Sequence, residues 1–274
     1  MAARTLRIGH LYPEIMSGYG DRGNLTTIAH RCRWRGIGVE VAELGLGRQP
    51  GPGGWDALDL IVIGHGGEFH QRLIAADLAW AKGPGLRGAV SQGAAVLAVG
   101  AGYELLGRFY QPRRGAELPG AAVFDTWTIQ HGTDLATASG PIREALAQRA
   151  IGDLLVRWGS ELLVGFENHS ASTYLGPAAR PLGEVLAGHG NHGDGTEGVR
   201  AGAAVGTYLR GPCLPRNPAL ADFLIRSALA RRYRDAELER VPDQLERTAH
   251  DSAVARIRKP PGAQGRGGSH AGGR

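Results

Sequence analysis

The feature that most constrains the fold of this chain is a regular alternation between short apolar runs and stretches with helical spacing. The apolar runs of strand length occupy residues 6–12, 39–45, 58–64 and 94–100. The helical patterns lie at residues 20–36, from about Gln71 to Ala81, and from Gly102 onward. Strands that are apolar along their whole length are typical of parallel sheets covered on both faces. We therefore expect an α/β fold in which a mostly parallel central sheet lies between two layers of helices.

The second half of the chain is richer in strand patterns and closes with one long helix. Strands are expected at residues 121–127, 162–169, 183–188 and 203–209. The helix is expected at residues 217–233, with Asn217 as its N-cap and Pro218 at its first helical position. The pattern weakens after Asp235, and from Lys259 the chain consists mainly of Gly, Pro, Arg, Ser and His. We expect one domain at residues 1–235 and a largely disordered tail at 236–274.

Charge and composition exclude several classes of protein. The formal net charge of +5 comes largely from the stretch HRCRWR at residues 30–35 and from the C-terminal tail, so the folded middle is nearly balanced. We expect no nucleic-acid partner, and the stretch HRCRWR is interpreted as the exposed end of the first helix. The chain has no run of 18 uncharged apolar residues and no signal-peptide pattern, which predicts a cytoplasmic protein without a membrane segment. The 2 cysteines lie in no metal-ligand spacing, so we expect neither a disulfide nor a metal site.

Four long motifs identify a family. They are LYPEIMSGYGDRGN, AVLAVGAGYELLG, LVGFENHSASTYLG and DGTEGVRAGAAVGTYLRGPCLPRNPALADFLI. In order and spacing they resemble the glutamine amidotransferase subunit of lipid II isoglutaminyl synthase, the GatD type, a CobB/CobQ-like branch of the class I amidotransferases. The resemblance runs from about Ile8 to Tyr233. It implies the three-layer, flavodoxin-like class I glutamine amidotransferase fold.

The resemblance also implies an activity and a partner. Members of that family hydrolyse glutamine and pass ammonia to a Mur-ligase-like protein, the MurT type, which uses ATP to amidate the D-glutamate of the peptidoglycan stem. The glutaminase needs no cofactor. It needs a cysteine at a strand-to-helix elbow, a histidine that moves the proton, an acidic residue, and backbone N–H groups that form an oxyanion hole.

Three positions of this sequence depart from that machinery. The elbow cysteine falls at Gly100, within AVGAGY, and the histidine falls at Arg210, within GTYLRGP. Glycine offers no nucleophile, and arginine stays protonated at physiological pH and cannot act as a general base. The oxyanion loop, which in the family has a pattern like GGGQDREQ, is GHGGEFHQ at residues 64–71. Three changes at one reaction centre predict lost glutaminase chemistry.

Other positions of the family pattern are retained. Asp21 corresponds to the acidic catalytic residue, and Arg149 corresponds to an arginine that binds glutamine or relays to the partner. The remaining positions expected to bind a ligand are His65, Gly66, Ala101, Glu167 and His169. The ligand would be glutamine or another small amine or acid.

Each departure has a structural interpretation beside the functional one. Gly100 could simply relieve backbone strain at the elbow. Arg210 could bind an acidic ligand or seal the old pocket, or it could form a salt bridge with Asp21 or Glu104. Replacement nucleophiles (Cys213 or Ser91) and a site built from His65, His70 and His169 remain alternatives.

Three functions are therefore open. The first is a catalytically degenerate GatD-like subunit that pairs with a MurT-like ligase as a structural or regulatory component of a heterodimer, while the partner uses ammonia or another amine. The second is an enzyme with altered chemistry in the old pocket. The third is an ordinary glutaminase subunit that supplies ammonia for amidation of peptidoglycan D-glutamate, with its nucleophile changed artificially. We favour the first, in either cell-wall or specialised metabolism.

Overall fold

The computed structural model describes residues 4–130, 149–234 and 237–258, and its core is a six-stranded sheet in the order β13-β14-β4-β3-β1-β2. The strands are β1 (Thr5–Leu11), β2 (Gly38–Leu44), β3 (Leu60–Ile63), β4 (Ala95–Val99), β13 (Val199–Ala201) and β14 (Ala204–Thr207). All pairings are parallel except that of the edge strand β13 with β14. β3 and β4 are buried at every position, as the continuous apolar runs predicted.

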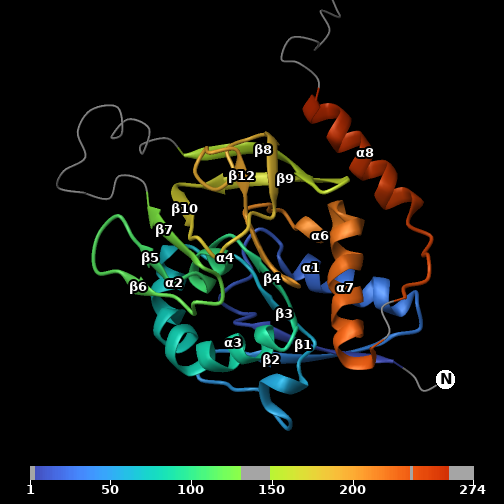
Figure 1. Cartoon of the computed structure of the whole chain (residues 1–274), viewed down its shortest axis with the longest axis horizontal. Helices are drawn as coiled ribbons and strands as arrows, with labels where there is room; N and C mark the ends of the chain where they lie inside the picture. Colours follow the sequence, from blue (N-terminus) through green and yellow to red (C-terminus); the bar gives the residue numbers. More distant parts are fainter. Residues whose placement is uncertain (1–3, 131–148, 235–236, 259–274) are drawn as a thin grey trace, which may run out of the picture.

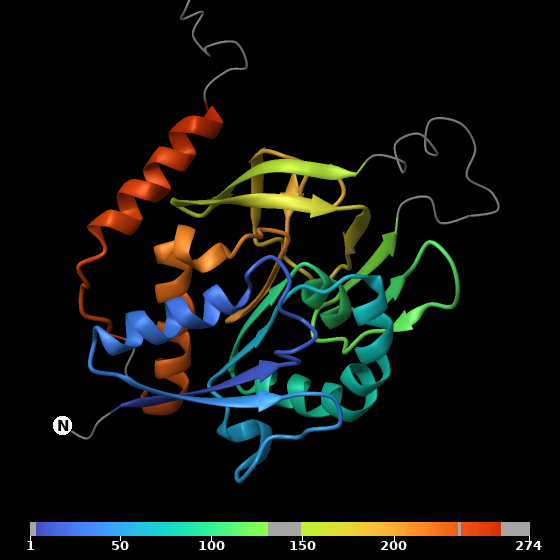
Figure 2. The same ribbon diagram turned by 180° about the vertical axis from the view of Figure 1, so that it is seen from behind.

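Helices cover both faces of this sheet (Figures 1 and 2). One layer holds α1 (Arg22–Arg33), the short α6 (Cys213–Arg216) and α7 (Pro218–Tyr233). The other holds α2 (Glu68–Ala76), the π-helical segment η2 (Asp77–Lys82), α3 (Gly83–Ser91) and α4 (Ala101–Leu106), and the short helix η1 (Gly54–Ala57) packs against α3. The expected three-layer α/β fold is confirmed. The helix expected at residues 71–81 is longer than predicted and changes winding along its length.

Two smaller sheets lie beside the central one (Figure 1). The first has the order β10-β7-β5-β6, with β5 (Phe109–Gln111), β6 (Leu118–Pro119), β7 (Thr126–Gln130) and β10 (Ala171–Leu175). The second has the order β12-β11-β8-β9, with β8 (Ala150–Trp158), β9 (Glu161–His169), β11 (Gly183–Ala187) and β12 (Thr196–Glu197). The strand expected at 121–127 is largely wrong, because β7 begins only at Thr126. Strand β8 was not predicted.

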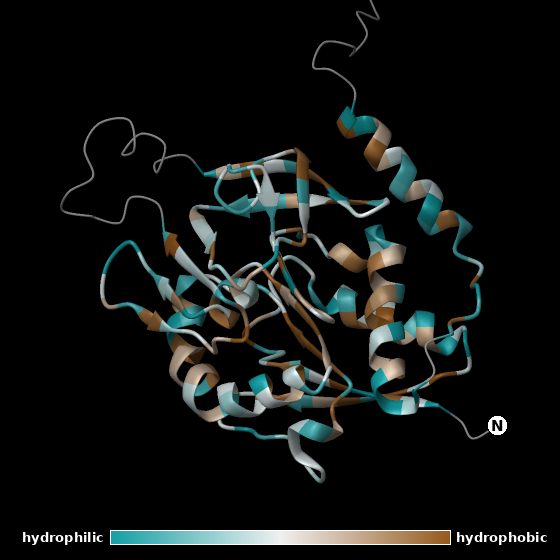
Figure 3. Cartoon of the chain, in the orientation of Figure 1, coloured by the Kyte–Doolittle hydropathy of each residue, from teal (hydrophilic) through white to brown (hydrophobic). Residues whose placement is uncertain are grey.

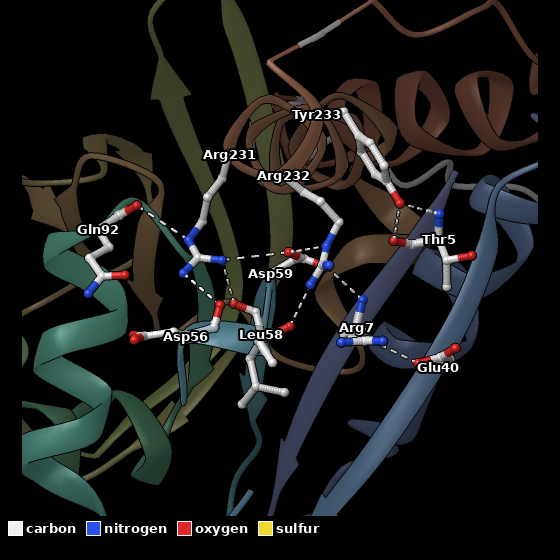
Figure 4. Close-up of polar contacts among 11 residues, drawn as sticks. Thr5, Arg7, Glu40, Asp56, Leu58, Asp59, Gln92, Arg231, Arg232 and Tyr233 are labelled. Carbon is white, nitrogen blue, oxygen red and sulfur yellow. Dashed lines mark hydrogen bonds and ion pairs between the residues drawn. The ribbon is translucent and has the colours of Figure 1, made fainter. Parts of the chain in front are cut away.

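The carboxyl end of α7 is held against the amino ends of the central strands by the side chains drawn in Figure 4. Asp59, which is fully buried, accepts hydrogen bonds from Nε of Arg232 at 2.8 and 2.7 Å. Arg231 donates to the carbonyls of Leu58 and Asp56 at 3.1 and 3.0 Å. These contacts hold α7 across the sheet, opposite to the end at which the elbow lies.

The amino end of α7 differs from the expectation for a simple N-cap. Asn217 precedes Pro218 as predicted, but its side chain makes no capping hydrogen bond. Instead, Oδ1 of Asn217 accepts from the N–H of Val164 at 2.8 Å, and its Nδ2 donates to the carbonyls of Val164 and Cys213 at 2.9 and 2.8 Å. The amide therefore joins β9 to the turn between α6 and α7.

The stretch HRCRWR is less exposed than its charge suggests. The guanidinium of Arg31 lies 2.7 Å from Asp222 and 2.9 Å from Asp243, and Arg35 also reaches Asp222, at 2.9 Å. Both arginine side chains are buried, as is Cys32, whereas Arg33 and Trp34 are exposed, so the expected amphipathic helix end exposes one face only. These ion pairs connect α1 to α7 and to the chain that follows it.

The chain beyond Asp235 contains one further helix, α8 (Gln244–Arg258), in part of the segment expected to be a largely disordered tail. Val254 of α8 packs on Leu155 and Val164 of the β8–β9 hairpin. Figure 3 shows mostly hydrophilic residues on α8, in contrast to the apolar central strands. The disorder expected from Lys259 falls outside the described residues. Within those residues, no helix combines the length and apolar character required to cross a bilayer.

Candidate functional site

The turn between β4 and α4 has the geometry of a nucleophile elbow, and Gly100 stands at its apex. Gly100 adopts φ 56° and ψ −118°, in the region that favours glycine. Its N–H donates to the carbonyl of Thr207 on β14 at 2.9 Å, and its carbonyl accepts from Glu104 of α4 at 3.0 Å. The elbow is therefore fixed by both neighbouring elements. It presents no side chain.

The space in front of Gly100 is already filled. A Cβ built on Gly100 would lie 2.8 Å from Nδ1 of His65 and 2.9 Å from Nη2 of Arg210. Distances under 3.0 Å are not tolerated by a real Cβ unless a neighbour moves. The side chain of a cysteine at this position would therefore clash with both His65 and Arg210. The three replaced segments of the sequence thus meet at one point.

His65 covers the backbone donor that follows the elbow. The N–H of Ala101 lies 3.1 Å from Nδ1 of His65, and Nη1 of Arg210 lies 3.1 Å from its Nε2. Burial and the charge of Arg210 lower the pKa of His65 to about 3, so the ring is neutral at neutral pH. A neutral imidazole accepts through one nitrogen only, so the two donors compete for it. Either way, the ring occupies the position where an oxyanion would meet Ala101.

Asp21 supports the loop that carries His65. Its Oδ2 accepts from the backbone N–H of His65 at 2.6 Å, and the N–H of Gly18 donates to the carbonyl of His65 at 2.8 Å. Burial raises the pKa of Asp21 to about 6, against the opposing effects of the His65 N–H and Arg210. The retained acidic residue therefore holds the 64–71 loop in place.

Arg210 is buried without a carboxylate partner. It is 2 % exposed, and desolvation lowers its pKa. Neither Asp21 nor Glu104 lies within ion-pair distance of it among the described residues, so the salt-bridge interpretation is wrong. Glu104 instead accepts from Gln71 at 2.7 Å and from Tyr208 at 3.2 Å. Nε of Arg210 has no hydrogen-bond partner within the described structure.

Tyr19 completes the cover over the site, a role that the sequence analysis missed. Its ring centroid lies 5.4 Å from Cζ of Arg210 and 5.3 Å from the ring of His65. Its hydroxyl accepts from Nδ2 of Asn168 at 3.1 Å, and Oδ1 of Asn168 accepts from Nε of Arg149 at 2.6 Å. Arg149 thus lies at the rim, joined through Asn168 to the cover. The position of Tyr19 in the YGDRGN motif, two residues before Asp21, was the available signal.

The other expected ligand positions have contacts away from the elbow. Glu167 accepts from the N–H groups of His189 and Gly190 at 2.6 and 3.0 Å. His169 donates from Nδ1 to the carbonyl of Ala171 at 2.8 Å and stacks on Tyr208. Gly66 is buried beside Met16 and His70. A Cβ on Gly66 would lie 2.6 Å from the sulfur of Met16, so the loop is packed tightly there.

The candidate replacement nucleophiles have other contacts within the described residues. Oγ of Ser91, the last residue of α3, donates to the carbonyl of Gly88 at 2.8 Å. Burial raises the pKa of the Cys213 thiol, which lies 3.6 Å from Oδ1 of Asn24, and raises that of Cys32 to about 12. Both thiols are protonated near neutral pH. In the part of the chain that the structure describes, no group of three or more His, Cys, Asp or Glu is placed to hold a metal ion.

Comparison with known proteins gives a consistent set of relatives. Residues 7–218 match the CobB/CobQ-like glutamine amidotransferase domain. A protein of Streptococcus pneumoniae is 32% identical over 244 residues, which cover 88% of this chain and 87% of the relative. A protein of Staphylococcus aureus is 30% identical over 256 residues, which cover 93% of this chain and 97% of the relative. Both are described as subunit GatD of lipid II isoglutaminyl synthase (glutamine-hydrolyzing).

Solved structures support the fold class. PurLQS from Thermotoga maritima superimposes with a TM-score of 0.50 at 12% identity, covering 82% of this chain and 97% of that chain. A glutamine amidotransferase from the same organism gives a TM-score of 0.50 at 12% identity, covering 92% and 97%. At such low identity the likeness concerns the fold alone, and it confirms the expected flavodoxin-like class I amidotransferase fold.

Proposed function

This chain belongs to the CobB/CobQ-like glutamine amidotransferase family, and on that premise we propose that it is a GatD-like subunit that has lost its own glutaminase. It pairs in the cytoplasm with a MurT-like, ATP-dependent ligase as a structural or regulatory component. The partner uses free ammonia or another amine. The single observation that carries this proposal is the position of Arg210 and His65, whose side chains fill the space of the missing nucleophile.

The chemistry of glutamine hydrolysis explains why this observation supports the proposal. The reaction needs a thiolate at the elbow and a free backbone donor for the oxyanion. Here the elbow has no side chain, and Nδ1 of His65 lies 3.1 Å from the N–H of Ala101. The cation of Arg210 replaces the base. Removing the nucleophile of a catalytic unit lowers kcat by about a million-fold, so only background turnover is expected.

Pairing with a ligase is supported by the relatives. Each of the two is described as one subunit of a synthase, and the similarity extends over most of both chains. A catalytically inactive subunit would persist if the ligase needed it for folding or for control. The surface around the elbow that includes Tyr19 and Arg149 would then be retained because it contacts the ligase, and not because it takes part in glutamine hydrolysis.

The alternative is an active glutaminase subunit, which the described activity of the relatives favours. It would require hydrolysis of glutamine without a nucleophile at residue 100. The same assay separates the two functions.

The experiment measures glutamate release from glutamine by the purified chain, alone and with the co-expressed ligase-like protein. The matched control is His65→Gly/Gly100→Cys/Arg210→His, which restores the nucleophile and the base of the family pattern and removes the ring that covers the N–H of Ala101. Background turnover together with stable co-purification of the ligase supports the proposal. Turnover well above background by the wild-type chain would overturn it, whatever the ligase does.

A further inference from the structure

A second candidate site lies far from the elbow in the sequence, at the turn of the β8–β9 hairpin. A cavity of about 660 Å³ is lined by Trp158, Glu161, Arg180, Leu182, Arg200 and neighbouring backbone. The cavity opens widely to solvent, and it is large enough to admit a small molecule. None of the elbow residues lines it.

Two arginines that are neighbours in a β-bridge line this cavity. Arg180 and Arg200 form an isolated antiparallel bridge, in which the N–H of Arg200 donates to the carbonyl of Arg180 at 2.8 Å. Side chains that stand opposite each other in such a pair lie on the same face, and like charges in these positions repel. The bridge therefore brings two positive side chains to one face, where a bound anion would reduce their mutual repulsion.

No carboxylate neutralises this pair within the described residues. The contrast is Arg157, beside the cavity, which forms an ion pair with Glu184 at 3.0 Å. Arg180 and Arg200 are exposed and belong to no such pair in the described structure. Their charges are therefore available to a ligand.

Arg200 is also held in one orientation. Its Cζ lies 4.7 Å from the centre of the Phe223 ring, and its Nε donates to the carbonyl of Gly202 at 3.0 Å. Phe223 in turn packs edge-on against Trp158, with ring centroids 5.4 Å apart. A guanidinium that is fixed in this way loses less entropy when it binds a phosphate through two nitrogens.

The remaining lining groups restrict the ligand further. Trp158 is half-buried and supplies an apolar ring surface, whereas Glu161 is an exposed carboxylate that accepts from hydroxyl groups. A bare inorganic dianion would gain nothing from either group. We propose that the cavity binds a nucleotide, with the phosphates against Arg180 and Arg200, the base against Trp158 and the ribose hydroxyls toward Glu161.

The test is isothermal titration of the full chain with ADP, inorganic phosphate and adenosine. ADP is expected to bind, and Arg180→Gln and Arg200→Gln are each expected to weaken it about tenfold, whereas Arg157→Gln leaves it unchanged. Trp158→Phe is expected to weaken the binding of ADP but not that of inorganic phosphate. Thermal melts verify that each variant is folded. Arg200→Lys keeps the positive charge but lacks the planar guanidinium that can bind a phosphate through two nitrogens, so it should lose less ADP affinity than Arg200→Gln.

Three results would overturn the proposal: no binding of ADP, equal binding of adenosine and ADP, or wild-type affinity in both glutamine variants. Equal affinities for ADP and inorganic phosphate would overturn the contact with the base. None of these outcomes depends on glutaminase activity or on the ligase, so failure here leaves the proposed function untouched.

Discussion

Arg210 occupies the space that a side chain on residue 100 would need, since a Cβ on Gly100 would lie 2.9 Å from Nη2 of Arg210 and 3.0 Å from its Nε. The two replacements therefore depend on each other. An arginine fits at 210 because residue 100 has no side chain, and a side chain at 100 fits better when Arg210 is absent, although Nδ1 of His65 still lies 2.8 Å from the Cβ position.

This dependence predicts non-additive stability. Gly100→Ala should destabilise the chain by about 2–3 kcal/mol, because alanine at a φ of 56° is strained and its Cβ meets Arg210. In an Arg210→Ala background the loss should be smaller by about 1 kcal/mol or more. Urea unfolding of the four proteins measures the coupling. Additive effects would show that the two positions are independent.

A buried cation without a carboxylate predicts an unusual effect of substitution. Arg210→Met should leave stability unchanged or raise it by about 1–2 kcal/mol, because it removes a guanidinium that is 2 % exposed and has an unpartnered Nε. Arg232→Met is the matched comparison. It should destabilise by about 1–2 kcal/mol, because it removes the guanidinium bound to the fully buried Asp59 and leaves only the longer ion pair with Arg231 at 3.6 Å. Equal losses in the two variants would contradict this difference.

The buried carboxyl of Glu197 predicts a pH dependence. Burial raises the pKa of Glu197 from 4.5 to about 7 in the folded chain. Because the folded pKa is raised, the folded state is favoured below pH 4.5 and loses this advantage as the pH rises through about 7. Glu197→Gln keeps an acceptor for Thr207 and Tyr208 but carries no charge.

Glu197→Gln should therefore match the wild type at about pH 4 and exceed it by up to about 3 kcal/mol at pH 8, by the linkage of pKa and stability. Chemical denaturation at pH 4, 6 and 8 measures this. A difference that stays constant with pH would show that the carboxyl is not responsible.

Asn217 offers a test that separates a helix cap from a tertiary contact. If Asn217 acted as an N-cap, serine would replace it with little loss. The structure places its amide against Val164 and Cys213, so both Asn217→Ser and Asn217→Ala should destabilise by about 3 kcal/mol, since several buried backbone groups lose their partner. Thermal or urea unfolding distinguishes these outcomes, and a mild effect of serine alone would restore the capping interpretation.

Much of the fold follows from local pattern. The apolar runs at β3 and β4 determine buried parallel strands, because a strand covered on both faces has no position for a polar side chain. The run at residues 39–45 contains Glu40 and Glu43 and forms the edge strand β2, which is mostly exposed, so burial on both faces was not fulfilled there. The motif AVGAGYELLG likewise determines an elbow with glycine at its apex. The changed residues at 100, 210 and 64–71 were identified from the sequence, and so was the expectation that they share one site.

The tertiary structure decided how those residues meet. From the sequence, Arg210 could bind an acidic ligand, seal the old pocket or form a salt bridge. The structure shows no salt bridge for it among the described residues, and it places the guanidinium against His65 and under Tyr19. It also turned Asn217 toward β9 and buried Arg31 in ion pairs. The physical reason is the same in each case. The periodicity of apolar residues in the sequence indicates which face of a helix or strand is buried. The hydrogen-bond partner of a polar side chain, in contrast, often lies on an element that is distant in the sequence, so only the tertiary structure identifies it.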